Sequence, residues 1–122
     1  MNNYIFAFLG AGIGGVLRLF ISSKTNELFP FFPYGTLVVN VLGSFLIGFF
    51  IFGLADKQLI SSELKIFLTV GICGGFTTFS TFSYETLQLF RNSEFFLGGL
   101  NIILSFILSL FGVYLAYIIF RG

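Results

Sequence analysis

Small polar residues recur every four positions in two stretches of this sequence that are otherwise hydrophobic. The two series are Thr36, Asn40, Ser44 and Gly48, and Asn101, Ser105, Ser109 and, one position early, Gly112. Residues four apart share one face of a helix, so each series predicts a narrow uncharged stripe. Amides and hydroxyls can donate hydrogen bonds to a small anion, and they can equally join neighbouring helices. Neither stripe contains an acidic residue, which disfavours a path for cations.

A third segment, residues 71–83, combines the glycine pair Gly74-Gly75 with several β-branched and hydroxyl-bearing residues. Such residues are poor helix formers, so we expect a break in a helix here, near the middle of the membrane. Carbonyl oxygens freed by a break need a partner, and loose carbonyls in membrane proteins bind cations. Phe79 and Phe82 lie three residues apart and would share one helical face after the break.

The composition excludes several kinds of functional site. The 122 residues include no His and one Cys, Cys73, so a His-based metal site, a Ser-His-Asp triad and an intramolecular disulfide are excluded. The formal net charge is +1 and there is no basic run, which gives nucleic-acid binding no electrostatic basis. We therefore expect neither an enzyme nor a partner of nucleic acids, and we interpret Cys73 as a packing residue.

The hydrophobic stretches predict the architecture. The chain is 57% hydrophobic and 9% charged, whereas a soluble domain is about 25% charged. A helix that crosses the hydrocarbon core needs about 20 mainly apolar residues, and four stretches qualify: 4–21, 34–54, 64–90 and 96–120. We expect an all-α membrane protein with a single four-helix transmembrane domain over residues 1–122. No Lys or Arg precedes Arg18, so the first stretch is expected to be a retained span rather than a signal peptide.

The basic residues do not favour one orientation in the bilayer. Orientation follows the Lys and Arg content of the short loops. The N-terminus, second loop and C-terminus would carry Lys57, Lys65 and Arg121, and the first and third loops Arg18, Lys24 and Arg91. This tie predicts that the chain inserts both ways and pairs as an antiparallel homodimer. The alternative is a weakly biased protein that another signal orients.

Three motifs together resemble the Fluc (CrcB) family of microbial fluoride channels. They are Gly12-x-Gly14-Gly15-x-x-Arg18, Gly35-Thr36-Leu37-Val38-Val39-Asn40-x-x-Gly43 and Gly74-Gly75-Phe76-Thr77-Thr78-Phe79-Ser80-Thr81-Phe82-Ser83. The first is weak by itself and the third is highly specific. Chain length, number of spans, balanced charge and motif order also match, so the resemblance covers the whole chain.

The resemblance implies a fluoride-selective channel for passive export of cytoplasmic fluoride, and so fluoride resistance, in the plasma or inner membrane. It implies an antiparallel dual-topology homodimer with two pathways, each lined by both subunits. The implied pathway residues are Asn40, Phe79, Thr81, Phe82, Ser105 and Ser109. Arg18 and Glu85 would lie at the vestibule or support it. The backbone carbonyls of Gly74 and Thr77 would bind a structural Na⁺ that is not transported.

The chemistry of the stripes agrees with this function. Fluoride is small and strongly hydrated, so a pore must replace its water with donors that still release it. Amides and hydroxyls meet this requirement, and the edges of Phe rings carry partial positive charge. The alternative is a small dual-topology, proton-coupled exporter of drugs or metabolites. Such an exporter would need a carboxylate in its first span, where this chain has none, and Glu85 in the third is the one candidate. A third alternative is an accessory subunit whose stripes only join helices.

Overall fold

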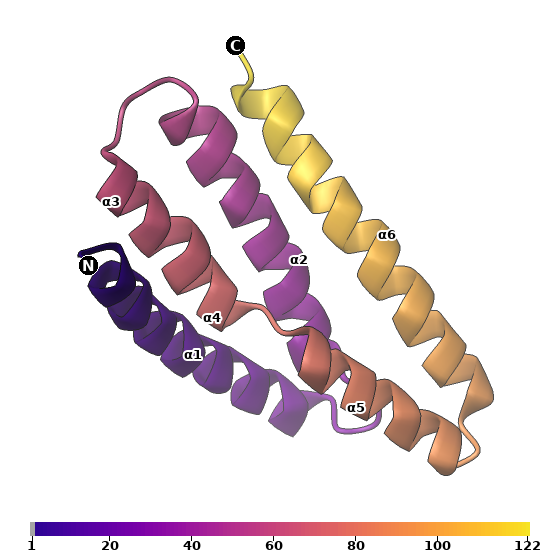
Figure 1. Cartoon of the computed structure of the whole chain (residues 1–122). Coiled ribbons are helices and arrows are strands. Elements are labelled where there is room, and N and C mark those ends of the chain that lie inside the picture. The colour runs from indigo at the N-terminus through magenta and orange to yellow at the C-terminus, as the bar shows by residue number, and fades with distance from the viewer. Residues whose placement is uncertain (1) are drawn as a thin grey trace.

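The computed structural model describes residues 2–122, and within them every regular element is a helix (Figure 1). Four stretches are long and apolar enough to cross a membrane, namely Asn2–Leu28, Tyr34–Ala55, Ser62–Arg91 and Phe95–Phe120. The prediction of an all-α membrane protein with four spans is therefore confirmed.

Three of the four stretches have continuous helical backbone. The first is α1 (Asn2–Leu28) and the fourth is α6 (Phe95–Phe120). The second begins as α2 (Tyr34–Gly48) and ends in a π-helical segment (Phe49–Ala55). α1 continues past residue 21, where its apolar stretch ends, because a helix satisfies its own backbone groups whatever surrounds it.

The third stretch is interrupted. α3 (Ser62–Ile66) leads through a π-helical segment (Phe67–Cys73) into α4 (Gly74–Phe76), and α5 (Phe79–Arg91) follows. Between α4 and α5, Thr77 and Thr78 have extended backbone, and the axis of α5 is offset from that of α4 (Figure 1). The Thr78 hydroxyl accepts a hydrogen bond from the Thr81 N–H at 3.2 Å and so caps α5.

The glycine pair does not itself interrupt the helix. Gly74 has helical angles, φ −63° and ψ −38°, and the interruption begins at Thr77. Gly75 is required for close packing, because a Cβ there would lie 3.0 Å from the Cα of Ala11 in α1. We call Thr77–Thr78, together with the end of α4, the interruption.

Glycines set the packing of α1 against the third stretch. A Cβ at Gly10 would lie 2.8 Å from the Cα of Gly71, and a Cβ at Gly14 would lie 2.8 Å from the backbone nitrogen of Phe76. Any larger residue would force these helices apart, so the close contact depends on the glycines at positions 10 and 14. α2 packs on α6 in the same way, where a Cβ at Gly48 would lie 2.6 Å from the Cβ of Ala116.

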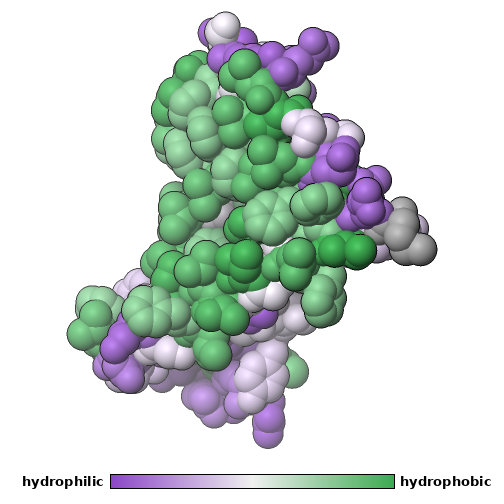
Figure 2. Space-filling view, turned by 90° about the vertical axis from the view of Figure 1, so that its left-hand side faces the viewer, coloured by the Kyte–Doolittle hydropathy of each residue, from purple (hydrophilic) through white to green (hydrophobic). Residues whose placement is uncertain are grey.

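The outer surface is that of a protein surrounded by lipid. Figure 2 shows a broad hydrophobic band between hydrophilic groups at the two ends of the molecule. Large apolar side chains are widely exposed, among them Phe8 (76%), Phe96 (78%) and Leu110 (69%). A monomeric soluble protein does not expose apolar surface on this scale, so this is a multi-pass membrane protein.

Candidate functional site

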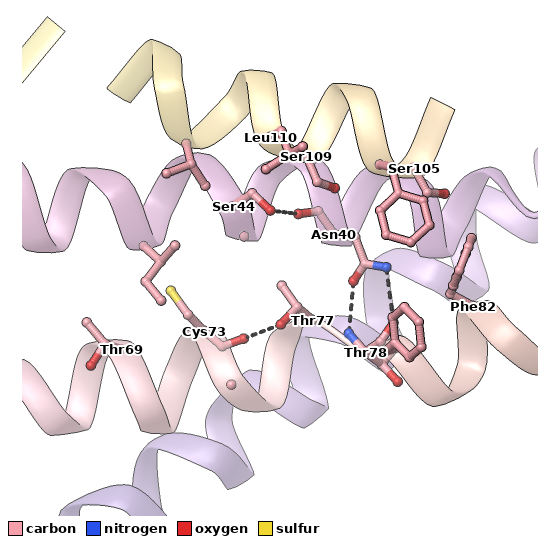
Figure 3. Close-up of a pocket in the computed structure, with 16 residues that line it drawn as sticks. Asn40, Ser44, Thr69, Cys73, Thr77, Thr78, Phe82, Ser105, Ser109 and Leu110 are labelled. Atoms are coloured by element: carbon pink, nitrogen blue, oxygen red, sulfur yellow. Dashed lines mark hydrogen bonds between the residues drawn. The ribbon is translucent and has the colours of Figure 1, made fainter. Parts of the chain in front are cut away.

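A cavity of about 400 Å³ lies between α2, α6 and the interrupted third stretch (Figure 3). Its polar lining consists of Asn40, Ser44, Thr69, Thr77, Thr78, Ser105 and Ser109, and its aromatic lining of Phe79, Phe82 and Phe106. No charged side chain lines this cavity within the part of the chain that the structure describes. The two polar stripes read from the sequence thus meet across one space.

Asn40 joins α2 to the interruption through both ends of its carboxamide. Its Nδ2 donates to the Thr78 carbonyl at 3.1 Å, and its Oδ1 accepts from the Thr78 N–H at 2.8 Å (Figure 3). These two bonds replace the helical partners that Thr78 lacks. A carboxamide nitrogen carries two hydrogens, and the hydrogen bonds of residues 2–122 use one of them. Asn40 therefore keeps a donor for a ligand in the cavity.

The hydroxyls that line the cavity differ in whether their protons are already engaged. Ser44 donates to the Asn40 carbonyl at 2.7 Å, and Thr77 donates to the Cys73 carbonyl at 2.9 Å. Ser105 reaches Oδ1 of Asn101 at 3.5 Å, which is long for an O–H···O bond. Ser109 has no hydrogen-bond partner among the described residues. A ligand that needs donors would therefore find them most readily on Asn40, Ser109 and Ser105.

Three phenylalanine rings close one end of this lining. The centroids of Phe79 and Phe82 are 5.4 Å apart, and Phe106 meets Phe82 edge-on at 5.9 Å and 87°. Phe82 is 6% exposed, whereas Phe79 is 68% exposed. The sequence analysis did not identify Phe106, because the chain has 20 phenylalanines and no single one stands out. The available signal was its position directly after Ser105 in the polar stripe.

Two other residues that were considered for the pathway do not line the cavity. The Thr81 hydroxyl accepts from Thr78 at 3.3 Å, so Thr81 belongs to the cap of α5. Asn101 is 2% exposed, and its Nδ2 donates to the hydroxyl of Thr86 at 2.9 Å. The Asn101 amide therefore joins α6 to α5.

The two charged residues expected near the vestibule occupy different places. Glu85 lines a second pocket of about 350 Å³ beside the connection between α1 and α2, together with Asn26, Tyr84 and Gln88. Its Oε1 is buried and has no hydrogen-bond partner among residues 2–122. Arg18 lines neither of these pockets, and its Nε donates to the Gly75 carbonyl at 3.0 Å.

The carbonyl oxygens around the interruption are partly used. Cys73 accepts from the N–H of Thr77 at 3.0 Å, and the Gly75 and Thr78 carbonyls accept from Arg18 and Asn40. Within residues 2–122 the carbonyls of Gly74 and Thr77 accept no hydrogen bond. Free backbone oxygens are ligands that a hard cation such as Na⁺ prefers, so the residues present fit a main-chain Na⁺ site. The described residues contain no cluster of three or more His, Cys, Asp or Glu side chains that could hold a metal otherwise.

Comparison with known proteins gives a consistent result along the whole chain. Residues 5–117 match the family described as CrcB-like protein, Camphor Resistance (CrcB). A fluoride-specific ion channel FluC from Campylobacter jejuni (strain RM1221) is 43% identical over 122 residues, which cover 99% of each chain. Proteins of the same name from Shewanella sp. (strain ANA-3) and Shewanella halifaxensis (strain HAW-EB4) are 48% and 47% identical over 116 residues, which cover 94% of this chain and 93% of each relative. The chain therefore belongs to the CrcB family, the family that its three motifs resemble.

Proposed function

We propose that this chain is a fluoride-selective channel that lets cytoplasmic fluoride leave passively and so confers fluoride resistance. The observation that carries the proposal is the cavity, which offers amide and hydroxyl donors and ring edges without any charged group. A fixed cation would bind the anion and delay its release, whereas neutral donors balance entry and exit. The names of the Campylobacter and Shewanella relatives support the same ion.

In this proposal Asn40, Ser105 and Ser109 donate hydrogen bonds to the passing ion. Phe79 and Phe82 present the positive edges of their rings. Thr81 contributes indirectly, because its N–H donates to the Thr78 hydroxyl that caps α5, one residue before Phe82. Glu85 supports the pathway from the second pocket.

A second, antiparallel copy would complete the pathway. The cavity is open on one side, and Gly74 and Phe79 on its border are exposed in the single chain. Arg18 is bonded within the bundle and is not a loop charge. The remaining loop charges are Lys57, Lys65 and Arg121 against Lys24 and Arg91, a difference of one, which is a weak orientation signal. Insertion in both orientations into the inner or plasma membrane agrees with this weak bias.

A structural Na⁺ would lie where two antiparallel interruptions cross near the bilayer midplane. The free carbonyls of Gly74 and Thr77 would contribute two oxygens from each copy. When bound, the cation would neutralise the partial negative charge of these oxygens, which lipid cannot do. The ion would be held and not transported.

Fluoride efflux from liposomes tests the proposal. The purified protein is reconstituted with internal potassium fluoride, and valinomycin is added to dissipate the membrane potential. We expect fluoride release that requires valinomycin, with chloride retained in a matched chloride-loaded sample. Protein-free liposomes are the control. Retention of fluoride combined with proton-driven uptake of an organic cation would instead establish the exporter, for which Glu85, on α5 and outside the cavity, is the candidate carboxylate.

A further inference from the structure

Arg18 is a charged side chain on the face of α1 that packs against the third stretch. It follows Gly10 and Gly14 at intervals of four residues, so all three lie on one face. Arg18 is partly buried, and within residues 2–122 it forms no ion pair with an acidic side chain. Its one polar contact among the described residues is the bond from Nε to the Gly75 carbonyl at 3.0 Å.

That carbonyl lies at the end of a helical run. The run from Ser62 to Phe76 leaves its last carbonyls without helical partners, and these oxygens carry partial negative charge. Inside a membrane no water is present to bond them. Arg18 thus satisfies one of these oxygens from a neighbouring helix.

We infer that Arg18 is the positioning residue of the interruption. Its bond to Gly75 holds the end of α4 against α1, between the carbonyls of Gly74 and Thr77, which accept no hydrogen bond within residues 2–122. That these two carbonyls are thereby kept for a cation rests on the proposed Na⁺ site. The positioning of the interruption is independent of that site, because it follows from the hydrogen bond of Arg18 to Gly75.

The role depends on the Nε–H donor and not on the positive charge, and two substitutions separate these properties. The Nε2 of glutamine is as many bonds from its Cα as the Nε of arginine, so Arg18→Gln retains a donor and removes the charge. Arg18→Met has a side chain of matching length and removes both. Lys24→Met is the control, because it removes a charge from the same helix, where the Lys24 ammonium contacts the Phe20 ring and not the interruption.

Cys73 is a natural reporter of the interruption. It is the one cysteine of the chain, is 3% exposed, and its carbonyl accepts from Thr77. We measure the rate at which a small neutral methanethiosulfonate modifies Cys73 in the purified, reconstituted protein. We expect Arg18→Met to raise this rate about tenfold, the factor that corresponds to losing one hydrogen bond at the upper end of the usual range. Arg18→Gln and Lys24→Met should modify at the parental rate.

The second measurement is the Na⁺ concentration that gives half-maximal fluoride efflux. We expect it to rise about tenfold in Arg18→Met and to stay near the parental value in Arg18→Gln. If Cys73 is modified equally fast in both variants, the charge and not the donor matters, and the inference is overturned. Parental rates in both variants overturn it as well. Failure of Arg18→Met to fold while Arg18→Gln folds supports it, and failure of both contradicts it.

The two proposals fail in different ways. If the parental efflux is indifferent to Na⁺, the cation site is wrong, and the Cys73 rates still decide whether Arg18 positions the interruption. If the parental efflux depends on Na⁺ but neither Arg18 variant differs from the parent, the cation site stands and the role of Arg18 is refuted.

Discussion

The adjacent residues Gly74 and Gly75 allow one prediction that separates packing inside a subunit from packing between subunits. A Cβ at Gly75 would lie 3.0 Å from two backbone atoms of Ala11 and closer still to its carbonyl oxygen. A Cβ at Gly74 would contact a single atom, the carbonyl oxygen of Thr69, at the ordinary distance of 3.8 Å. Gly74 also has helical backbone angles and is exposed. The two substitutions, Gly74→Ala and Gly75→Ala, therefore add the same methyl group but place it next to different atoms.

The expected magnitudes follow from these contacts. Gly75→Ala should destabilise the single subunit by about 1–3 kcal/mol, the usual cost of overpacking, because α1 has to move. Gly74→Ala should leave the subunit as stable as the parent or slightly more stable, because alanine favours a helix. If two copies meet at Gly74, the dimer gains two obstructing methyl groups. Even at about 1 kcal/mol each, their sum of about 2 kcal/mol weakens dimerisation roughly thirtyfold.

Two measurements check this pair. Thermal unfolding in detergent at a dilution where the parent is monomeric reports subunit stability, and photobleaching of singly labelled protein at decreasing protein-to-lipid ratios reports dimerisation. Parental dimer affinity in Gly74→Ala would show that this exposed glycine faces lipid and not a second copy. Parental stability in Gly75→Ala would show that α1 does not approach the third stretch as closely as described.

Four further changes test the pathway and the topology. Asn40→Asp should reduce fluoride efflux more than about a hundredfold, because a carboxylate repels the anion by about 4 kcal/mol at 4 Å and an effective dielectric constant of 20, while crosslinking should still detect the dimer. Phe79→Ile should slow efflux by up to about tenfold without lowering the melting temperature, since the ring is mostly exposed; an unchanged rate would make it a packing residue. Ser109→Ala should slow efflux more than Ser44→Ala, because the Ser44 proton is already bonded to a carbonyl, and the reverse order would contradict this hydrogen-bond assignment. Two lysines added to the connection that follows Ala55 should give one orientation by cysteine accessibility; a single orientation in the parent would exclude dual topology.

The sequence predicted the spans and the two stripes because both depend on local patterns. Hydrophobic length specifies a span, and a four-residue repeat specifies a helical face. Asn40, Ser105 and Ser109 accordingly line the cavity from the faces on which their spacing places them. The pairing of Asn40 with Thr78 could not be predicted, because these residues are 38 positions apart and their meeting depends on how far each helix slides along the other.

Helix propensity predicted a disturbance within residues 71–83, before Phe79, and the extended backbone of Thr77 and Thr78 lies within this segment. Glycine is a poor helix former, yet Gly74 is helical, and Gly75 lies in close contact with the backbone of α1. Tertiary packing here outweighs propensity, because the close contact needs a residue without a Cβ. The interruption falls after the glycine pair, at Thr77 and Thr78, and the Thr78 hydroxyl caps the helix that follows. A capping residue was the better signal than the glycines.

The hydrogen bonds of Asn40 couple the cavity to the interruption. One carboxamide satisfies both backbone groups of Thr78 and retains one N–H for the cavity. A ligand that draws on this N–H also polarises the bond to the Thr78 carbonyl, next to Thr77, whose own carbonyl is free. Aspartate can accept from the Thr78 N–H but cannot donate to the Thr78 carbonyl, so Asn40→Asp should disturb the interruption as well as the pathway. Faster modification of Cys73 in Asn40→Asp, measured without fluoride, would demonstrate this coupling. An unchanged rate would show that the two bonds of Asn40 act independently.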